Sequence, residues 1–374
     1  MHREQRQQTH DLLRQHGIQQ ALFARPESTK WLTGFAPPVQ TGPNLYATSY
    51  PLVWYDGGQF TLIVFESPTD HGYVELAAPF ANDADGHVVA YTGVRLDQPT
   101  SSADELLAAF KSVAKVSGKV GVERAYVSDQ IAHELYSGEV VAIDGWLEPL
   151  RMIKTAEELD TLRRNFALTD IGFAAARAAT AVGKREIDVW NATHGAIQAA
   201  AGCRVPLGND CVVGHRQANI GGWPLDYEIR ANDSLIVDLS VILDGYWSDG
   251  CRTYYAGERT QKQEKMHRTA LDALDLAISL ARPGTVAREI DQKVRAFIAD
   301  AGYPVYPHHT GHGVGVSGHE APRIVPYNEE VIREGMVLMF EPGIYFPGET
   351  GVRIEDAVLV KSSGPEVLTH HDKL

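Results

Sequence analysis

Residues 234–255 read SLIVDLSVILDGYWSDGCRTYY and place two aspartates among apolar, strand-forming residues. Asp238 interrupts a run of Leu, Ile and Val, and Asp249 follows after a turn. An uncompensated charge inside an apolar strand is very costly, so both carboxylates need a cationic partner. The nearest basic residue is Arg252. Two explanations are open at this point: a metal ion at both aspartates, or a structural role in which Asp249 only caps the turn.

A second stretch, residues 308–324, reads HHTGHGVGVSGHEAPRI and is rich in histidine and glycine. Glycine at this density lets the backbone approach a ligand closely and adopt irregular dihedral angles. The imidazoles therefore predict a functional loop, and the alternative is a chance His/Gly tract. The histidines of this stretch are His308, His309, His312 and His319.

Two glutamates near the C-terminus also lie inside apolar strand patterns. Glu341 belongs to MVLMFEPGIYF, and Glu355 belongs to GVRIEDAVLV. Arg353 and Glu355 are two residues apart, so in a strand their side chains point to the same face. A buried Arg353–Glu355 ion pair is the structural alternative to a ligand role for Glu355.

Together these segments supply four carboxylates and one imidazole: Asp238, Asp249, Glu341, Glu355 and His312. Four negative charges match two divalent cations, and bridging carboxylates would hold the ions about 3.5–4 Å apart, as in two-metal hydrolysis. One nitrogen among oxygen ligands favours Mn²⁺, Co²⁺ or Zn²⁺. The pattern thus predicts a dinuclear hydrolytic site whose bound water is a nucleophile near neutral pH.

The chain of 374 residues is too long for one ordinary core and predicts two domains. Residues 1–148 alternate short apolar runs with helical patterns, which indicates an α/β domain with a mixed sheet. Residues 149–374 change to long helices followed by strands, which indicates an α+β domain. Thr155 and Glu158 have the spacing of a capping box that opens the first of these helices.

Composition and charge exclude several classes of protein. The formal charge of −14 argues against nucleic acid or anionic lipid as a partner. The first residues form no apolar segment of a signal peptide, and no run is apolar enough to span a membrane, so we expect a cytoplasmic protein. The three cysteines have no framework spacing and are expected to be reduced and buried.

The order of these motifs resembles the pita-bread metallopeptidase family M24, the group of methionine aminopeptidase, aminopeptidase P and prolidase, which is also related to creatinase. The similarity rests on DLS…SDGCRT, HxxGHGxG followed by HE, EPGIY and VRIED. It covers residues 149–374 as a pita-bread catalytic domain. Residues 1–148 resemble the creatinase/prolidase-type N-terminal domain.

The resemblance implies a role for each matching residue. Glu341 would also act as the proton shuttle for the attacking water, and His319 would donate to the scissile carbonyl or the oxyanion. His308 would line the substrate pocket, while Tyr345 and Arg353 would orient the ligands and the product carboxylate. The ligands of the two metal ions would be Asp238, Asp249, His312, Glu341 and Glu355. A homodimer is also implied.

One position departs from the family pattern. Members that cleave proline peptides carry a histidine in the loop before the first aspartate strand, and alignment on Gly214 and Pro224 places Gly221 there. Glycine offers no polar contact, so we expect a wider pocket and weak cleavage of standard Xaa-Pro dipeptides. His215, six residues earlier, is the candidate that could fill the gap as a substrate-binding residue.

The sequence therefore predicts a dinuclear metal-dependent hydrolase, an Xaa-Pro dipeptidase or aminopeptidase acting on short peptides. The alternative is a creatinase-related hydrolase of a small non-peptide amide or cyclic amidine. A binding module without catalysis would be expected to lack some of the ligands, and this chain has them all.

Overall fold

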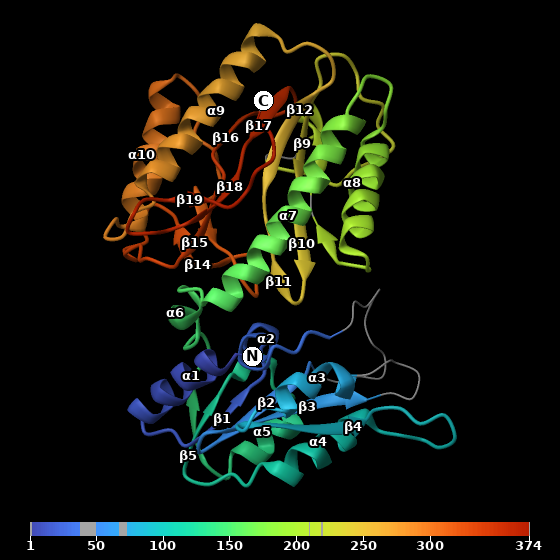
Figure 1. The fold of residues 1–374 in the computed structure, drawn as a ribbon, viewed down its shortest axis with the longest axis vertical. Helices are drawn as coiled ribbons and strands as arrows, with labels where there is room; N and C mark the ends of the chain where they lie inside the picture. Colours follow the sequence, from blue (N-terminus) through green and yellow to red (C-terminus); the bar gives the residue numbers. More distant parts are fainter. Residues whose placement is uncertain (1, 38–49, 67–72, 209, 218–219, 374) are drawn as a thin grey trace. The chain divides into compact units, whose positions relative to one another are not determined.

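The computed structural model describes residues 2–37, 50–66, 73–208, 210–217 and 220–373. The chain forms two compact units, Met1–Arg151 and Met152–Leu374 (Figure 1). Each unit has its own sheets and helices, and each is described by itself below.

The first unit contains a six-stranded sheet in the order β4-β3-β2-β1-β5-β6. The pairs β1–β2 and β2–β3 are antiparallel, whereas β1–β5, β5–β6 and β3–β4 are parallel. This mixed sheet confirms the α/β prediction for the N-terminal part. The strands are β1 (Gln20–Phe23), β2 (Leu52–Asp56), β3 (Gln59–Glu66), β4 (Gly86–Thr92), β5 (Lys119–Val122) and β6 (Glu139–Ala142).

Helices connect and cover these strands. Ser101 caps α4 by accepting a hydrogen bond from the Asp104 amide, and Ser128 caps α5 through the Ile131 amide. Such caps satisfy backbone donors that the first helical turn leaves without partners. The helices are α1 (Arg3–Gln15), α2 (Pro26–Thr33), α3 (Tyr73–Ala81), α4 (Ser102–Val113), α5 (Asp129–Leu135) and α6 (Glu148–Arg151).

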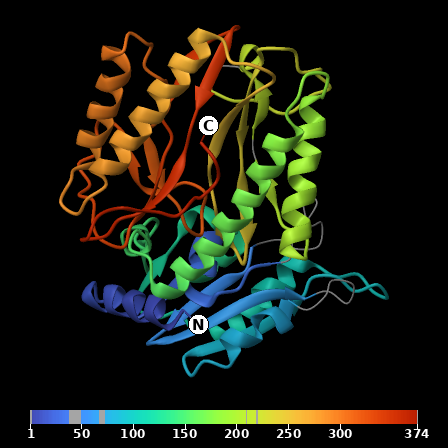
Figure 2. The same cartoon turned by 45° about the horizontal axis from the view of Figure 1, so that its top comes forward.

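The second unit has two pairs of long helices. The first pair is α7 (Ala156–Ala179) with α8 (Glu186–Ala201), and the second is α9 (Gln261–Leu280) with α10 (Ala287–Asp300). The predicted capping box opens α7, because Thr155 and Glu158 exchange hydrogen bonds between side chain and backbone. Figure 2 shows the two pairs on either side of the strands.

The strands between the helix pairs form short antiparallel sheets, with orders β12-β9-β8, β11-β10-β7, β14-β13-β15-β18-β19 and β16-β17. The apolar run that suggests one strand over 234–242 is divided at Leu239 into β9 and β10, which join different sheets. The strands are β7 (Leu207–Gly208), β8 (Cys211–Val213), β9 (Ser234–Asp238), β10 (Ser240–Leu243), β11 (Tyr246–Trp247), β12 (Cys251–Tyr255), β13 (Gly311–Gly313), β14 (Glu320–Ile324), β15 (Val337–Phe340), β16 (Gly343–Phe346), β17 (Thr350–Arg353), β18 (Asp356–Leu359) and β19 (Glu366–Val367).

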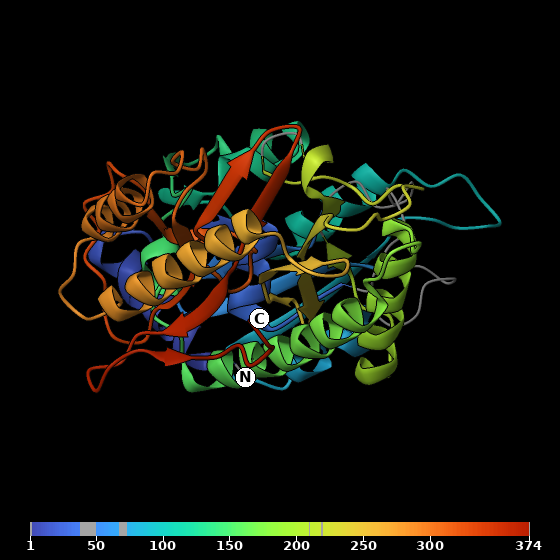
Figure 3. The same ribbon diagram turned by 90° about the horizontal axis from the view of Figure 1, so that it is seen from above.

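Apolar side chains fill the space between helices and strands in two clusters. One cluster joins α9 and α10 to β15–β18, and the other joins α7 and α8 to β8–β10. Helix α9 packs on the hairpin of β16 and β17, which Figure 3 shows from above. These helices close the outer faces of the sheets, so the polar strand residues are left to face one another inside the unit.

Two sequence expectations need adjustment. Cys211 and Cys251 are buried thiols as expected, but Cys203 is exposed because it follows the C-terminal end of α8. Arg252 is not the partner of the strand aspartates: its Nη2 donates to Asp356 Oδ1 at 2.6 Å, and both side chains are buried. Among the described residues, no helix is long and apolar enough to cross a membrane.

Candidate metal centre

Strand register brings the acidic residues together. Asp238 is the last residue of β9 and lies opposite Cys251 of β12. Cys251 also forms an isolated bridge to Glu355, which lies between β17 and β18, so the two acids flank the same residue. His312 is the middle residue of β13 and pairs with Met339 of β15. Segments more than a hundred residues apart in sequence therefore deliver their polar side chains to one place.

The His312 imidazole lies at the centre of three carboxylates. Its Nε2 is 3.7 Å from Asp249 Oδ2, 3.6 Å from Glu341 Oε1 and 3.9 Å from Glu355 Oε1. Its Nδ1 is 2.9 Å from the carbonyl oxygen of Gly313, and a carbonyl only accepts, so Nδ1 carries the proton. The lone pair of Nε2 consequently points toward the carboxylates, as a metal ligand requires.

Asp249 has one oxygen engaged by its surroundings and one directed into the cluster. Its Oδ1 accepts hydrogen bonds from the Gly250 amide at 3.0 Å and from Ser240 Oγ at 3.3 Å. Its Oδ2 is the atom that faces His312. The turn-capping alternative therefore accounts for only one of the two oxygens.

The electrostatics of the cluster favour a bound cation. Burial, followed by the charges of neighbouring acids, raises the pKa values of Asp249 and Glu355 well above their usual range. Burial lowers the pKa of His312 to about 3. Glu355 Oε1 is buried and has no hydrogen-bond partner among the described residues. Ligand atoms of Asp249, His312 and Glu355 all lie within 4.8 Å of one another, so these residues fit a divalent metal ion.

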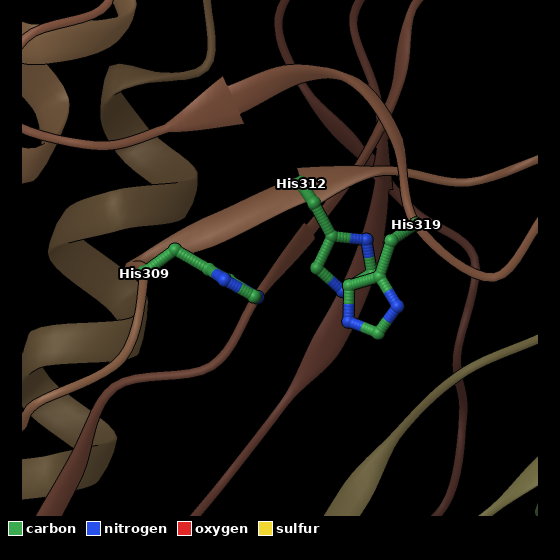
Figure 4. Close-up of side chains that lie close together, drawn as sticks. All are labelled: His309, His312 and His319. Carbon is green, nitrogen blue, oxygen red and sulfur yellow. The ribbon is translucent and has the colours of Figure 1, made fainter.

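Glu341 lies between this cluster and the other histidines of the loop. Its Oε1 is 2.6 Å from His309 Nε2, and its Oε2 is 3.7 Å from His308 Nδ1. Burial favours the neutral carboxyl, but the contact with His309 and the adjacent imidazoles outweigh it and lower the pKa of Glu341 to about 2. The side chains of His309, His312 and His319 lie together in Figure 4, and their ring nitrogens form a second group within 4.8 Å.

His319 lies beside the His312 imidazole, next to the acidic cluster. Its ring centroid is 4.0 Å from that of His312 and 5.4 Å from that of His309. His319 is exposed whereas His312 is buried, so the outer imidazole can meet a bound molecule. Although part of the side chain is exposed, the desolvation of its enclosed part and the nearby His309 lower the pKa of His319, which favours its neutral form.

Arg353 joins Asp238 to a carboxylate that the sequence analysis did not single out. Its Nη2 lies 2.8 Å from Asp238 Oδ2 and 3.0 Å from Asp210 Oδ2. The structure thus gives Asp238 a basic partner and does not show the Arg353–Glu355 pair that was the structural alternative. Burial and the charge of Asp238 raise the pKa of Asp210, against the opposing effect of Arg353.

Three other predicted pocket residues form a chain of contacts. His308 Nε2 lies 3.0 Å from the hydroxyl of Tyr345. The same hydroxyl accepts a hydrogen bond from Arg353 Nη1 at 3.2 Å. The structure therefore brings these three residues together along one side of the cluster, between Glu341 and Asp238.

The loop of Gly221 differs from the sequence expectation. A Cβ atom on Gly221 would lie 1.8 Å from Asp210 Oδ2, so the space next to this glycine is filled by a carboxylate and the expected widening is wrong. His215 is not placed with the cluster residues. Its ring packs edge-on against Tyr227, and its Nδ1 is 3.6 Å from Asp233 Oδ1.

Helix α10 supports the histidine loop through residues that sequence reasoning did not identify. Arg295 is paired with Asp291, one turn earlier, at 2.8 Å, and it donates to the carbonyl oxygen of His308. Asp291 also accepts a hydrogen bond from Thr310 Oγ1 at 2.6 Å. An Asp and an Arg four residues apart on a helix are usually a surface pair, so the sequence contains no signal for this role.

A mixed α/β unit followed by an α+β unit that gathers three carboxylates around an imidazole is the arrangement of a metal-dependent hydrolase. Residues 160–362 match metallopeptidase family M24, and residues 5–153 match the Creatinase/Prolidase N-terminal domain. The chain belongs to metallopeptidase family M24, and divalent metal ions are the cofactors that this family implies.

Relatives and solved structures agree with this assignment. An Xaa-Pro dipeptidase of Pyrococcus furiosus is 37% identical over 236 residues, which are 63% of this chain and 68% of the relative. The prolidase structure from the same organism has a TM-score of 0.78 at 28% identity and covers 97% of this chain and 99% of its own. The Xaa-Pro dipeptidase structure from Bacillus anthracis has a TM-score of 0.82 at 26% identity, covering 100% and 99%.

We predict that metal binding releases protons. Asp249 and Glu355 hold protons to higher pH than free carboxyls and must lose them to bind a cation, so metal affinity should rise with pH. His312, with its pKa of about 3, is already neutral and releases none. Titration calorimetry with Mn²⁺ in buffers of different ionisation enthalpy, repeated at several pH values, should detect a net release of protons on metal binding.

The matched control for this experiment is Glu355→Gln, which cannot titrate at that position. It should bind metal more weakly and release fewer protons than the wild type. Metal binding without proton release in the wild type would show that the two carboxyls are not the ligands.

Proposed function

We propose that this chain is a divalent metal-dependent peptidase that hydrolyses the Xaa-Pro bond of dipeptides and other short peptides. The observation that carries the proposal is the placement of three carboxylates within 4 Å of the buried His312 Nε2. The similarity to Xaa-Pro dipeptidases extends over both units of the chain, which supports the same substrate class.

The proposed ligands are the five residues expected from sequence. Two ions, Mn²⁺, Co²⁺ or Zn²⁺, would balance the four carboxylates, and the nitrogen ligand disfavours a site made only of oxygen. When bound, the metal would act as a Lewis acid and would lower the pKa of a water molecule bound to it to about 7. The ligands would be Asp238, Asp249, His312, Glu341 and Glu355.

Glu341 and His319 are the proposed catalytic residues. Glu341 has a low pKa and lies beside three imidazoles, so its carboxylate is available to accept a proton from water and pass it to the leaving amine. His319 is exposed next to His312 and would donate a hydrogen bond to the carbonyl oxygen as it gains charge.

Two alternatives carry less weight. The relatives and structures named above are peptidases, which does not favour a hydrolase of a cyclic amidine or other non-peptide amide. A non-catalytic binding role would leave the complete acidic cluster unexplained. The homodimer and the cytoplasmic location expected from sequence remain predictions.

A substrate panel tests the proposed function. With Mn²⁺, Co²⁺ or Zn²⁺ added in turn, the protein should cleave Xaa-Pro dipeptides or Xaa-Pro-Yaa tripeptides, lose activity with a chelator and recover it with metal. Product amino acids should be quantified by chromatography. Hydrolysis of small cyclic amides without any cleavage of the peptides would contradict the proposal and favour the non-peptide alternative.

Two histidine variants separate ligand from catalyst. His312→Ala removes the central nitrogen ligand and should lose most of the bound metal. His319→Ala should retain the metal and lose about 10²–10³ in kcat, because an oxyanion donor is removed. Metal content and steady-state kinetics should be measured on both variants. Equal loss of metal in the two proteins would show that the roles are assigned wrongly.

A further inference from the structure

Asp210 occupies the position beside Gly221, next to the proposed metal ligands. Its Oδ1 accepts a hydrogen bond from the Gly222 amide at 3.0 Å, and its backbone carbonyl accepts one from the Asp238 amide at 3.0 Å. Its other oxygen fills the volume that any side chain at Gly221 would need. The carboxylate is therefore held in place by the strand and the loop, and its side chain is 26% exposed.

The guanidinium of Arg353 has no free Nη hydrogen. Its Nη2 lies between Asp210 and Asp238, and its Nη1 donates to the Tyr345 hydroxyl and to the carbonyl of Ile220. An arginine has four Nη hydrogens, so these four acceptors use them all. The side chain is 5% exposed, and the remaining Nε is buried. A substrate carboxylate could reach the Nη atoms of Arg353 only by displacing one of these acceptors. Of the two carboxylates among them, Asp210 is the more exposed, at 26% against 11% for Asp238.

The charges lead to the same conclusion. The four ligand carboxylates are balanced by two divalent ions, which leaves the positive charge of Arg353 and the negative charge of Asp210 to balance each other. Without Asp210, the guanidinium would keep its contact with Asp238. The ions already balance the charge of that carboxylate, so one positive charge would remain in excess next to the metal centre. Such a charge attracts an anionic group of a substrate.

We propose that Asp210 is a specificity-determining residue that neutralises Arg353 and selects substrates whose leaving residue has no free carboxylate. The proposal rests on the proposed function and deepens it. The preferred substrates are amidated or extended Xaa-Pro peptides, in which the carboxyl group after proline is an amide. Free Xaa-Pro dipeptides are poorer substrates, because their carboxylate meets the carboxylate of Asp210.

The test compares Ala-Pro with Ala-Pro amide, which differ only in the terminal group. The wild-type protein should have a kcat/KM for the amide about tenfold above that for the acid. Asp210→Asn keeps the shape of the side chain and removes its charge, so it should raise kcat/KM for the acid about tenfold and change that for the amide little. Metal content should be the same in both proteins.

Asp226→Asn is the matched control. Asp226, like Asp210, lies between α8 and β9. Its side chain is 80% exposed in a surface pair with Arg185. Removing its charge should therefore leave unchanged the ratio of kcat/KM for Ala-Pro to that for Ala-Pro amide. An unchanged ratio in Asp210→Asn, or a wild-type preference for the free acid, would overturn the proposal. If Asp210→Asn does not fold, the wild-type ratio of kcat/KM for the amide to kcat/KM for the acid decides alone whether the proposal holds.

Equilibrium binding separates this proposal from the proposed function. Calorimetry on the metal-loaded protein should show weaker binding of proline than of prolinamide. Asp210→Asn should reduce the ratio of the two dissociation constants about tenfold. If neither peptide is cleaved, the proposed function fails, while the binding difference still tests the role of Asp210. Equal affinity for proline and prolinamide in the wild type would contradict it.

Discussion

The architecture of the second unit depends on one constraint: buried carboxylates around His312 that only cations can balance. Three carboxylate oxygens approach the Nε2 of this histidine from three different segments of the chain. Such a cluster is strongly unfavourable unless its charge is neutralised. The sheets that deliver these residues and the helix pairs that cover the sheets therefore form the frame that holds this cluster together.

The same constraint explains which parts were predictable from sequence. A carboxylate in an apolar strand is conspicuous, so Asp238, Glu341 and Glu355 stand out without any structure. The helices follow from caps such as Thr155, and the N-terminal sheet follows from its alternating elements. These signals are local, and local signals can be read along the chain.

What could not be predicted depends on contacts between distant segments. Asp210 precedes a short strand and has no distinctive pattern, yet it lies against Gly221 and Arg353. The glycine suggested an open pocket because the sequence shows only which side chain is missing. The structure shows that the volume is filled by a carboxylate from another part of the chain. The support of the histidine loop by Arg295 is equally invisible in the sequence.

We propose that the buried carboxylates and His312 hold two divalent ions. The most direct test of this proposal is anomalous diffraction from crystals of the Mn²⁺-loaded protein at the manganese edge. We expect two anomalous peaks about 3.5–4 Å apart, in contact with Asp249, His312 and Glu355. A peak held only by His309, His312 and His319, or no peak among the carboxylates, would contradict it.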